Sequence, residues 1–421
     1  MLPTRYRCTP AVLLVLFASA IPGIVAYALR HPRRDLHQLT LANAADHSGL
    51  TENANGSVLM LEVTNHGFWL YTTTIAVGNP PQSFQAAIDI GWSDSWVPSI
   101  SCSDSVYCDP HPLYDAANSS SYNADGRNVS LHHWAFYTRG IVSRDSMHIG
   151  DLEVGNVTFE EASMVHPVYF FDDTWYDAAL GLAREVVVSE ESTLQVQSPF
   201  QHMIQQKLLK RNMFSLLLPQ TTLDVGMLTI GGLPDKAMLS HLAVTLPTIG
   251  KDSDPHVQDT FYLSGGWEVN PVSMSFGHHS NVVRYDLSNH VAAFSTMDFA
   301  FDIPYAFYEV IRDTLDIDGI DGSVECDKID AGLPNLVISL KGYNDQIHDF
   351  VVTPADYIRF EPREPFIDPK RCQCIIAFHD ETKEDVPRFI SLGSVFLSKY
   401  LSIFDNDAKA ITLSPLSEHR N

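Results

Sequence analysis

The chain has 421 residues, 45% of them hydrophobic, and can bury one large core or two. Its 27 basic and 51 acidic side chains give a formal net charge of −24 at pH 7. This balance predicts no nucleic-acid partner, because proteins that bind phosphate backbones present a basic face. It suits a soluble surface that tolerates acid, where carboxylates begin to neutralise.

Residues 1–28 have the form of a secretory signal peptide. Arg5 and Arg7 precede the apolar run AVLLVLFASAIPGIVAYAL, which contains small-x-small cleavage sites ending at Ala20 and Ala28. An uncleaved signal anchor is the alternative, since the run approaches the length that spans a bilayer. No second apolar span follows, so we expect no membrane span once the signal is cleaved.

Residues 29–65 show little periodicity and are expected to form a leader or short pro-segment that is loosely packed. The stretch RHPRR ends in a dibasic pair, which predicts processing after Arg34. Passage through a secretory lumen also gives meaning to Asn-x-Ser/Thr triplets. The expected glycosylation sites are Asn55, Asn118, Asn128 and Asn156.

From about residue 66 the sequence alternates short β-branched and aromatic runs with Gly, Pro, Asn and Asp. GMLTIGG at 226–232 and NLVISLKG at 335–342 are examples. This pattern predicts an all-β protein with many strands. Helices are expected over 199–211 and 303–315, the second with a proline near its first turn.

Two motifs recur in the same order along the chain. AAIDIGW at 86–92 has a counterpart in AAFSTMD at 292–298, and YDAALGLA at 176–183 has one in RFISLGSVF. Each half thus holds a loop at a strand end, which we call a tip loop, followed by an apolar-Leu-Gly strand. The repeat predicts two similar β lobes facing each other across a cleft, over residues 66–245 and 246–421.

The cysteines that remain after signal cleavage are odd in number, so one thiol is left over. Cys102 and Cys108 are close enough to close one small loop. Cys326 can close a longer one with either Cys372 or Cys374. The Cys-x-Cys spacing is too cramped for zinc ligands, and we predict neither a metal site nor another cofactor.

Further motifs give the chain a resemblance to the pepsin-like aspartic proteases, peptidase family A1, over roughly residues 66–417. They are IAVGNPPQSF, the WVPS stretch beginning at Trp96, GIVSRDSMHIG, LPNLVISLKG and the final ISLGSVFLSKYLSIFDNDAKAITLSP. The resemblance implies a bilobal double β-barrel with a central cleft and a few short helices. It also implies that Cys102 and Cys108 form the family's small loop disulfide.

Proteases of this family cleave peptides with two aspartates, each in an Asp-Thr-Gly or Asp-Ser-Gly loop, whose carboxylates share one proton. In the first tip loop, Asp89 matches the first of these aspartates and Gly91 is kept. Ile90 stands at the Thr position and Trp92 at the following Ser position, so two hydroxyls are absent and apolar bulk is added.

The second tip loop departs further from the family pattern. Counting back from Pro304 places Ser295 at the position of the second aspartate. Thr296 keeps its hydroxyl, Met297 replaces Gly, and Asp298 falls where Thr or Ser belongs. A register three residues later would make Asp298 the second acid, but it would break the match of the preceding strand.

The hairpin that covers the cleft in this family is also altered. The stretch LHHWAFYTRG has no glycine before Gly140, so the tip lacks the freedom that glycines give to such a lid. Tyr137 on a shortened hairpin is one candidate for the covering tyrosine. His133 or Trp134 in its place is the alternative.

We therefore predict a secreted homologue that lacks ordinary peptidase activity and acts as a binding or inhibitory module. The alternative is an enzyme, either a residual acid endopeptidase or a cleft in which Asp89 serves another reaction as a lone acid or base. Apolar neighbours would raise the pKa of such a carboxyl. The expected ligand in the cleft is a peptide, a protein or a small molecule, bound by a monomer that is extracellular or held in a vacuole.

Overall fold

The structure is a computed structural model of the whole chain. It describes residues 53–66, 70–102, 108–109, 111–133, 136–167, 176–187, 192–221, 223–234, 239–250, 265–278, 281–298, 300–317, 323–329, 332–359, 371–383 and 386–416. The predicted signal peptide and the predicted processing site at Arg34 lie outside these residues.

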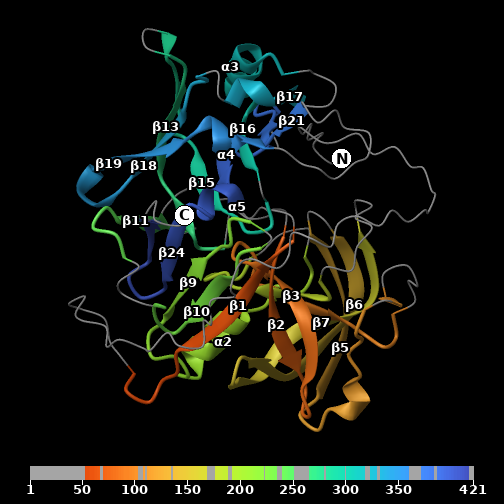
Figure 1. Ribbon diagram of the computed structural model, residues 1–421. Coiled ribbons are helices and arrows are strands. Elements are labelled where there is room, and N and C mark those ends of the chain that lie inside the picture. Colours follow the sequence, from red (N-terminus) through yellow and green to blue (C-terminus); the bar gives the residue numbers. More distant parts are fainter. Residues whose placement is uncertain are drawn as a thin grey trace, which may run out of the picture.

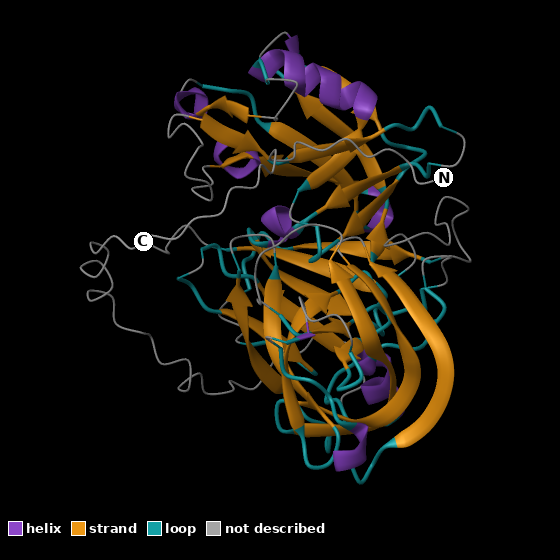
Figure 2. Ribbon diagram, turned by 90° about the vertical axis from the view of Figure 1, so that its right-hand side faces the viewer, coloured by secondary structure: helices purple, strands orange, loops and turns teal. Residues whose placement is uncertain are grey.

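The described residues form two β-rich lobes, one above the other in Figure 1, and both views show the same division (Figures 1 and 2). This confirms the predicted all-β, bilobal fold. The strands of the first half are β1 Leu59–Asn65, β2 Tyr71–Val77, β3 Gln82–Asp89, β4 Trp96–Pro98, β5 Asn123–His133, β6 Phe136–Ile149, β7 Leu152–Pro167, β8 Ala178–Gly181, β9 Met213–Leu217 and β10 Gly226–Ile230.

The second half contributes most of the upper lobe of Figure 1, and some of its strands reach down to the first half. Its strands are β11 Val244–Ile249, β12 Glu268–Val269, β13 Pro271–Phe276, β14 Val283–Asp286, β15 Val291–Phe294, β16 Phe301–Pro304, β17 Ser323–Glu325, β18 Leu336–Lys341, β19 Ile347–Val352, β20 Ile358–Arg359, β21 Arg371–Cys374, β22 Ile376–His379, β23 Phe389–Leu392, β24 Tyr400–Asp405 and β25 Ala410–Pro415.

An antiparallel sheet joins the two lobes. The order of its strands is β1, β10, β9, β24, β25, β11, so three strands of the first half are followed by three strands of the second. The contact between halves is the β9–β24 pair, where Phe214 stacks on Phe404 with ring centroids 4.7 Å apart. Because the C-terminal strands complete a sheet begun by the first half, the lobes share one hydrophobic core.

Strand pairing confirms the internal repeat. In the first half, β3 runs parallel to β8, and β4 pairs with both β8 and β7. In the second half, β15 runs parallel to β23, and β16 pairs with both β23 and β22. Each tip loop therefore connects two strands that flank the same Leu-Gly strand.

The helices are α2 Pro199–Gln205, α3 Tyr305–Leu315, α4 Pro354–Tyr357 and α5 Ser394–Leu397. Both predicted helices exist, but each is shorter than expected. The α2 helix starts where the Ser198 hydroxyl accepts the Gln201 amide, and it ends before Lys207, whose φ is +57°. The α3 helix starts only after Pro304, because residues 301–304 belong to β16.

One expectation about the leader is wrong. Residues 59–65 form β1, which is buried at every second side chain and pairs with β10. The apolar residues Leu59, Leu61 and Val63 alternate with polar or exposed ones, as a strand with one buried face requires. The tail of the leader is therefore part of the folded core, and its boundary at residue 65 stays a prediction.

Disulfides join Cys102 to Cys108 and Cys326 to Cys372. Among the described cysteines, Cys374 lies outside both disulfides, and it is buried. A search of the described residues for long apolar helices found none that could cross a membrane.

Candidate functional site

The first tip loop leaves the buried strand β3 at Asp89. This residue lies opposite Gly181 of β8 in the parallel ladder, and its carbonyl accepts the Leu182 amide at 2.7 Å. A Cβ on Gly181 would lie 2.7 Å from the carbonyl oxygens of Trp92, Ser93 and Asp94. Glycine is required here because the tip loop folds directly over the neighbouring strand.

The Asp89 carboxyl is 5% exposed and is held by the loop's own backbone. Its Oδ1 accepts the Gly91 amide at 3.0 Å, and the Trp92 amide also donates to the carboxyl. Burial raises the pKa of Asp89 to about 7, although both amide hydrogen bonds lower it. The carboxyl is therefore neutral in mildly acidic solution.

The two apolar substitutions in this loop point into the protein. Ile90 is fully buried in the main core, and Trp92 is 1% exposed in a small cluster with Ala183 and Val187. The indole of Trp92 thus packs beneath the loop. Apolar packing here removes water from the neighbourhood of Asp89, which agrees with the raised pKa.

A polar network supports the first loop from below. Asp94 is fully buried, and it accepts hydrogen bonds from the Ser93 and Ser192 hydroxyls and from the Val196 amide at 3.1 Å. Burial raises its pKa despite these donors. The network binds the tip loop to the segment around residue 192, which gives Asp94 a role in holding the scaffold.

The second tip loop leaves β15 in the same way as the first leaves β3. Phe294 lies opposite Leu392 of β23, as Ile88 lies opposite Leu180 of β8. The next residue is Ser295, whose amide donates to the Leu392 carbonyl. Ser295 thus follows β15 at the level where Asp89 ends β3.

The Ser295 hydroxyl accepts two backbone amides, as the Asp89 carboxyl does in the first loop. Its Oγ accepts the Met297 amide at 3.2 Å and the Asp298 amide at 3.0 Å, the two amides that correspond to those of Gly91 and Trp92. The side chain is 4% exposed. With both amides as donors to Oγ, the hydroxyl hydrogen remains available for donation.

Asp298 and Met297 serve the loop in different ways. The Asp298 Oδ1 accepts the Ala300 amide at 3.1 Å, and its carbonyl accepts the Ser394 amide at 2.7 Å. The side chain thus closes its own turn, which disfavours the shifted register. Met297 packs partly buried against a hydrophobic cluster of the N-terminal lobe that includes Trp96 and Leu131.

Thr296 connects the two tip loops. Its hydroxyl donates to the Ile88 carbonyl at 2.5 Å and accepts the Ile90 amide at 3.2 Å. Thr296 is fully buried, so this exchange takes place away from water. Ile90, at the matching position of the first loop, has no hydroxyl with which to return the contact.

The covering hairpin consists of β5 and β6, which pair up to His133 and Phe136. Trp134 lies outside the described residues, and so does the side chain of His133. Tyr137 faces His132 across the hairpin, with ring centroids 5.9 Å apart, and the Arg139 side chain donates to its hydroxyl. The Tyr137 hydroxyl is thereby engaged on its own strand.

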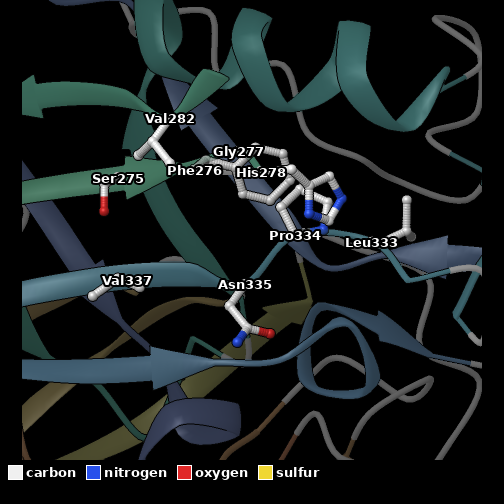
Figure 3. Close-up of a pocket in the computed structure, with 9 residues that line it drawn as sticks. All are labelled: Ser275, Phe276, Gly277, His278, Val282, Leu333, Pro334, Asn335 and Val337. Carbon is white, nitrogen blue, oxygen red and sulfur yellow. The ribbon is translucent and has the colours of Figure 1, made fainter. Parts of the chain in front are cut away.

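A cavity of about 290 Å³ lies at the end of β13 in the C-terminal lobe. Figure 3 shows the rings of Phe276 and His278 beside Pro334, with Val337 on the facing strand β18 and Asn335 just before that strand. The residues that line it carry no carboxylate, and its sheet, β14–β13–β18–β19, contains neither tip loop. It is therefore separate from the Asp89 site.

The two tip loops, which Thr296 connects, carry one buried carboxyl and one hydroxyl at matching positions. Asp89 can donate a proton or a hydrogen bond while it is neutral, and it can accept a proton above its pKa. Ser295 can donate a hydrogen bond, but its hydroxyl cannot hold a charge in this pH range. Among the described residues, no group of His, Cys, Asp and Glu side chains could hold a metal ion.

Residues 70–416 match the family model for the eukaryotic aspartyl proteases. The chain belongs to this family. It is 30% identical to a vacuolar aspartic protease of Candida albicans, over 84% of this chain and 77% of that protein. It is 27% identical to pepsin A of Gallus gallus, over 84% and 86%, and 26% identical to cathepsin D of Dictyostelium discoideum, over 81% and 82%.

Family membership confirms the resemblance seen in the sequence. Two features of the site were missed there. Ser192 approaches Asp94 from almost a hundred residues away, and no local motif marks it. For Met297 the sequence predicts a lost glycine and an apolar neighbour of Asp89, but not a contact with the other lobe. A long apolar side chain at a cleft-facing loop is a signal that could have predicted its contact with the other lobe.

Proposed function

We propose that this member of the aspartyl protease family binds peptides in its interlobe cleft without cleaving them by the family's two-carboxylate reaction. The proposal rests on the two backbone amides that donate to the Ser295 hydroxyl. In the proposal, this hydroxyl stands where the family has its second carboxylate. Family hydrolysis needs one carboxylate to activate water while the other holds a proton. A cleft with Asp89 alone lacks that division of roles.

The expected loss of rate is large. A single general acid or base contributes about 10²–10⁴-fold, and groups that act as a unit lose most of their effect when one is removed. Met297 adds to this, since its side chain reaches the opposite lobe from a loop position where the family has glycine. Both changes leave the scaffold of the cleft in place while altering its chemistry.

The proposal includes a secreted or vacuolar location, as for the vacuolar and pepsin relatives. All four predicted glycosylation asparagines lie on exposed positions, as modification requires, at Asn55, Asn118, Asn128 and Asn156. Acidic surroundings also suit the buried carboxyls. Burial raises the pKa of Glu160 to about 8 and that of Glu268 to about 7, so both are neutral in acid. Cleavage of the signal, the lobe boundary at residue 245 and a monomeric state belong to the same proposal.

The raised pKa of Asp89 favours a second candidate function. A carboxyl with a pKa of about 7 in an apolar site is suited to act as a general acid near neutral pH. In this case the cleft would be enzymatic, either as a residual acid endopeptidase or in another reaction with Asp89 as the lone acid or base.

Peptide binding tests the proposal. Fluorescein-labelled peptides from a pepsin digest of haemoglobin are titrated with the purified protein at pH 4–5, and anisotropy reports binding. Chromatography of each mixture shows whether the peptides remain intact. We expect saturable binding that pepstatin displaces, with no new fragments. Absence of binding at millimolar concentration overturns the proposal, and fragments that Asp89→Asn abolishes establish the enzymatic candidate.

A further inference from the structure

A buried chain of alternating acidic and basic groups lies in the C-terminal lobe, outside the site described above. His379 Nδ1 lies 2.7 Å from Asp302 Oδ1, and its Nε2 lies 3.3 Å from Glu381 Oε1. The same Glu381 oxygen lies 2.8 Å from His290 Nε2. The side chains are between 3% and 13% exposed, so these contacts are shielded from solvent.

Two of the four groups lie on or beside the strands that carry the second tip loop. His290 directly precedes β15, and Asp302 belongs to β16. These two strands enter and leave the loop that contains Ser295 and Thr296. His290 thus lies at the end of β15 away from the tip loop, whereas Asp302 is the second residue of β16, close to the end that leaves the loop.

His379 is central to this arrangement. It ends β22, which pairs with β16, and its ring stacks on Phe389 with centroids 4.1 Å apart and planes 7° apart. Phe389 begins β23, which pairs with both β15 and β16. Since both ring nitrogens face carboxylates, the charged imidazolium is the form that can donate to each.

A cavity of about 500 Å³ borders this acid–base chain and gives protons a route to it from the solvent. His290 and Glu381 line this cavity, so protons can reach them through it. Other titratable or charged groups of the neighbouring elements line the same cavity or lie beside it. They are Tyr285 and Asp286 of β14, Tyr305 and Glu309 of α3, Asp380 and Lys383 after β22, and Arg388 before β23.

We propose that the Asp302–His379–Glu381–His290 chain is a proton-controlled clamp that holds β15 and β16 together and so positions the second tip loop against the first. The clamp is closed while His379 carries its proton. When His379 becomes neutral, one of its two donors is lost, and with it the attraction between the imidazolium and the two buried carboxylates. Such a loss is strongly unfavourable in the protein interior.

The pH range of the clamp follows from its two shifted groups. Burial alone would lower the pKa of His379, but the carboxylates of Asp302 and Glu381 raise it to about 9. Its stabilisation is therefore complete below the ordinary histidine pKa and is lost as pH rises through 9. Burial alone would raise the pKa of Glu381, but His290 and His379 lower it to about 2. Its stabilisation is complete above the ordinary glutamate pKa, so the clamp is strongest in mild acid.

Thr296 transmits this effect to the cleft. It is the residue of the second loop that hydrogen-bonds to both Ile88 and Ile90 of the first. Opening of β15 and β16 would withdraw its hydroxyl from that contact. The clamp does not depend on whether the cleft cleaves peptides or only binds them, because its action is conformational.

Deuterium exchange read by mass spectrometry tests the clamp, with rates corrected for their intrinsic pH dependence. Wild type is compared with His379→Gln and with His241→Gln, which changes an exposed histidine. For peptides covering residues 291–304, we expect the opening equilibrium of wild type and His241→Gln to rise up to roughly a hundredfold between pH 6.5 and 9.5. In His379→Gln it is already high at pH 6.5 and nearly independent of pH.

Peptides covering residues 82–89 report the titration of Asp89 near pH 7, which separates it from the change near pH 9 that His379 causes. Protection of 291–304 that stays constant in wild type up to pH 9.5 overturns the clamp, and so does an unchanged pH dependence in His379→Gln. If His379→Gln does not fold, His290→Gln keeps the Asp302–His379 pair and removes one end of the chain. It should then expose 291–304 more than His241→Gln does at pH 6.5, and equal protection in the two variants overturns the clamp.

Discussion

At the first tip loop, a carboxyl accepts the amides of Gly91 and Trp92; at the second, a hydroxyl accepts the amides of Met297 and Asp298. The strands that lead to the two loops pair in the same way. The backbone of the repeat has thus been kept while its chemistry has diverged. Two amide donors at such a loop therefore define a place for an acceptor, and either a carboxylate or a hydroxyl can occupy it.

Removal of the charge at the first loop should have the largest effect. Asp89→Asn keeps an amide oxygen as acceptor but cannot ionise. Because the folded-state pKa of Asp89 is raised to about 7, wild-type stability falls as pH rises from about 4 to 7 and then levels off. At pH 8 we expect Asp89→Asn to be more stable than wild type by about 2–4 kcal/mol, with little difference at pH 4.

Urea unfolding at both pH values measures this difference. Asp151→Asn, a change at an exposed turn position, is the matched control and should leave stability unchanged at each pH. An Asp89→Asn protein that is less stable than wild type at pH 8 would show that the carboxylate is charged and well solvated in the folded state.

The contact between the loops should be the next most sensitive feature. Thr296→Val removes a hydroxyl that pairs with the Ile90 amide and the Ile88 carbonyl, both of them buried. Leaving these groups without partners should lower the free energy of unfolding by about 2–3 kcal/mol. Thr296→Ser keeps the hydroxyl and should lose no more than about 1 kcal/mol. Equal losses in the two variants, measured by urea unfolding at pH 5, would remove the hydroxyl from the explanation.

The reach of Met297 across the cleft should have the smallest effect on stability. Met297→Ala gives up partly buried contacts with the N-terminal cluster, which we expect to reduce the free energy of unfolding by about 1 kcal/mol. Met60→Ala, on the exposed face of β1, should change it by less than about 0.5 kcal/mol. Calorimetric titration with pepstatin should show tighter binding to Met297→Ala than to wild type. Weaker binding would mean that Met297 supports the ligand.

Local patterns were enough to predict the bilobal β fold, because a strand, a tight loop and a Leu-Gly strand each leave a short signature. That Ser295 stands at the position of the family's second aspartate stays a prediction. The alternation of Leu59, Leu61 and Val63 was also visible but was assigned to a loosely packed leader. Only its pairing with β10 shows that it belongs to the core.

Other features depend on register between distant segments. Cys372 and Cys374 point to the same side of β21, and pairing decides between them: Cys372 lies opposite Val324, close to Cys326, whereas Cys374 lies opposite Ile358. The clamp is similar, since its members are scattered between residues 290 and 381. Hydrogen-bond partners that the fold brings together from separate strands leave no spacing in the sequence to read.

Acid proteolysis tests most directly whether the two tip loops, with Ser295 in the second, supply only one carboxylate to the cleft. Denatured haemoglobin is incubated at pH 4 with wild type and with Asp89→Asn, each with and without pepstatin, and new peptide termini are counted by mass spectrometry. We expect wild type to release no more fragments than Asp89→Asn, and we expect pepstatin to leave the number of fragments unchanged. Fragments that wild type produces, that pepstatin suppresses and that Asp89→Asn fails to produce would contradict this expectation.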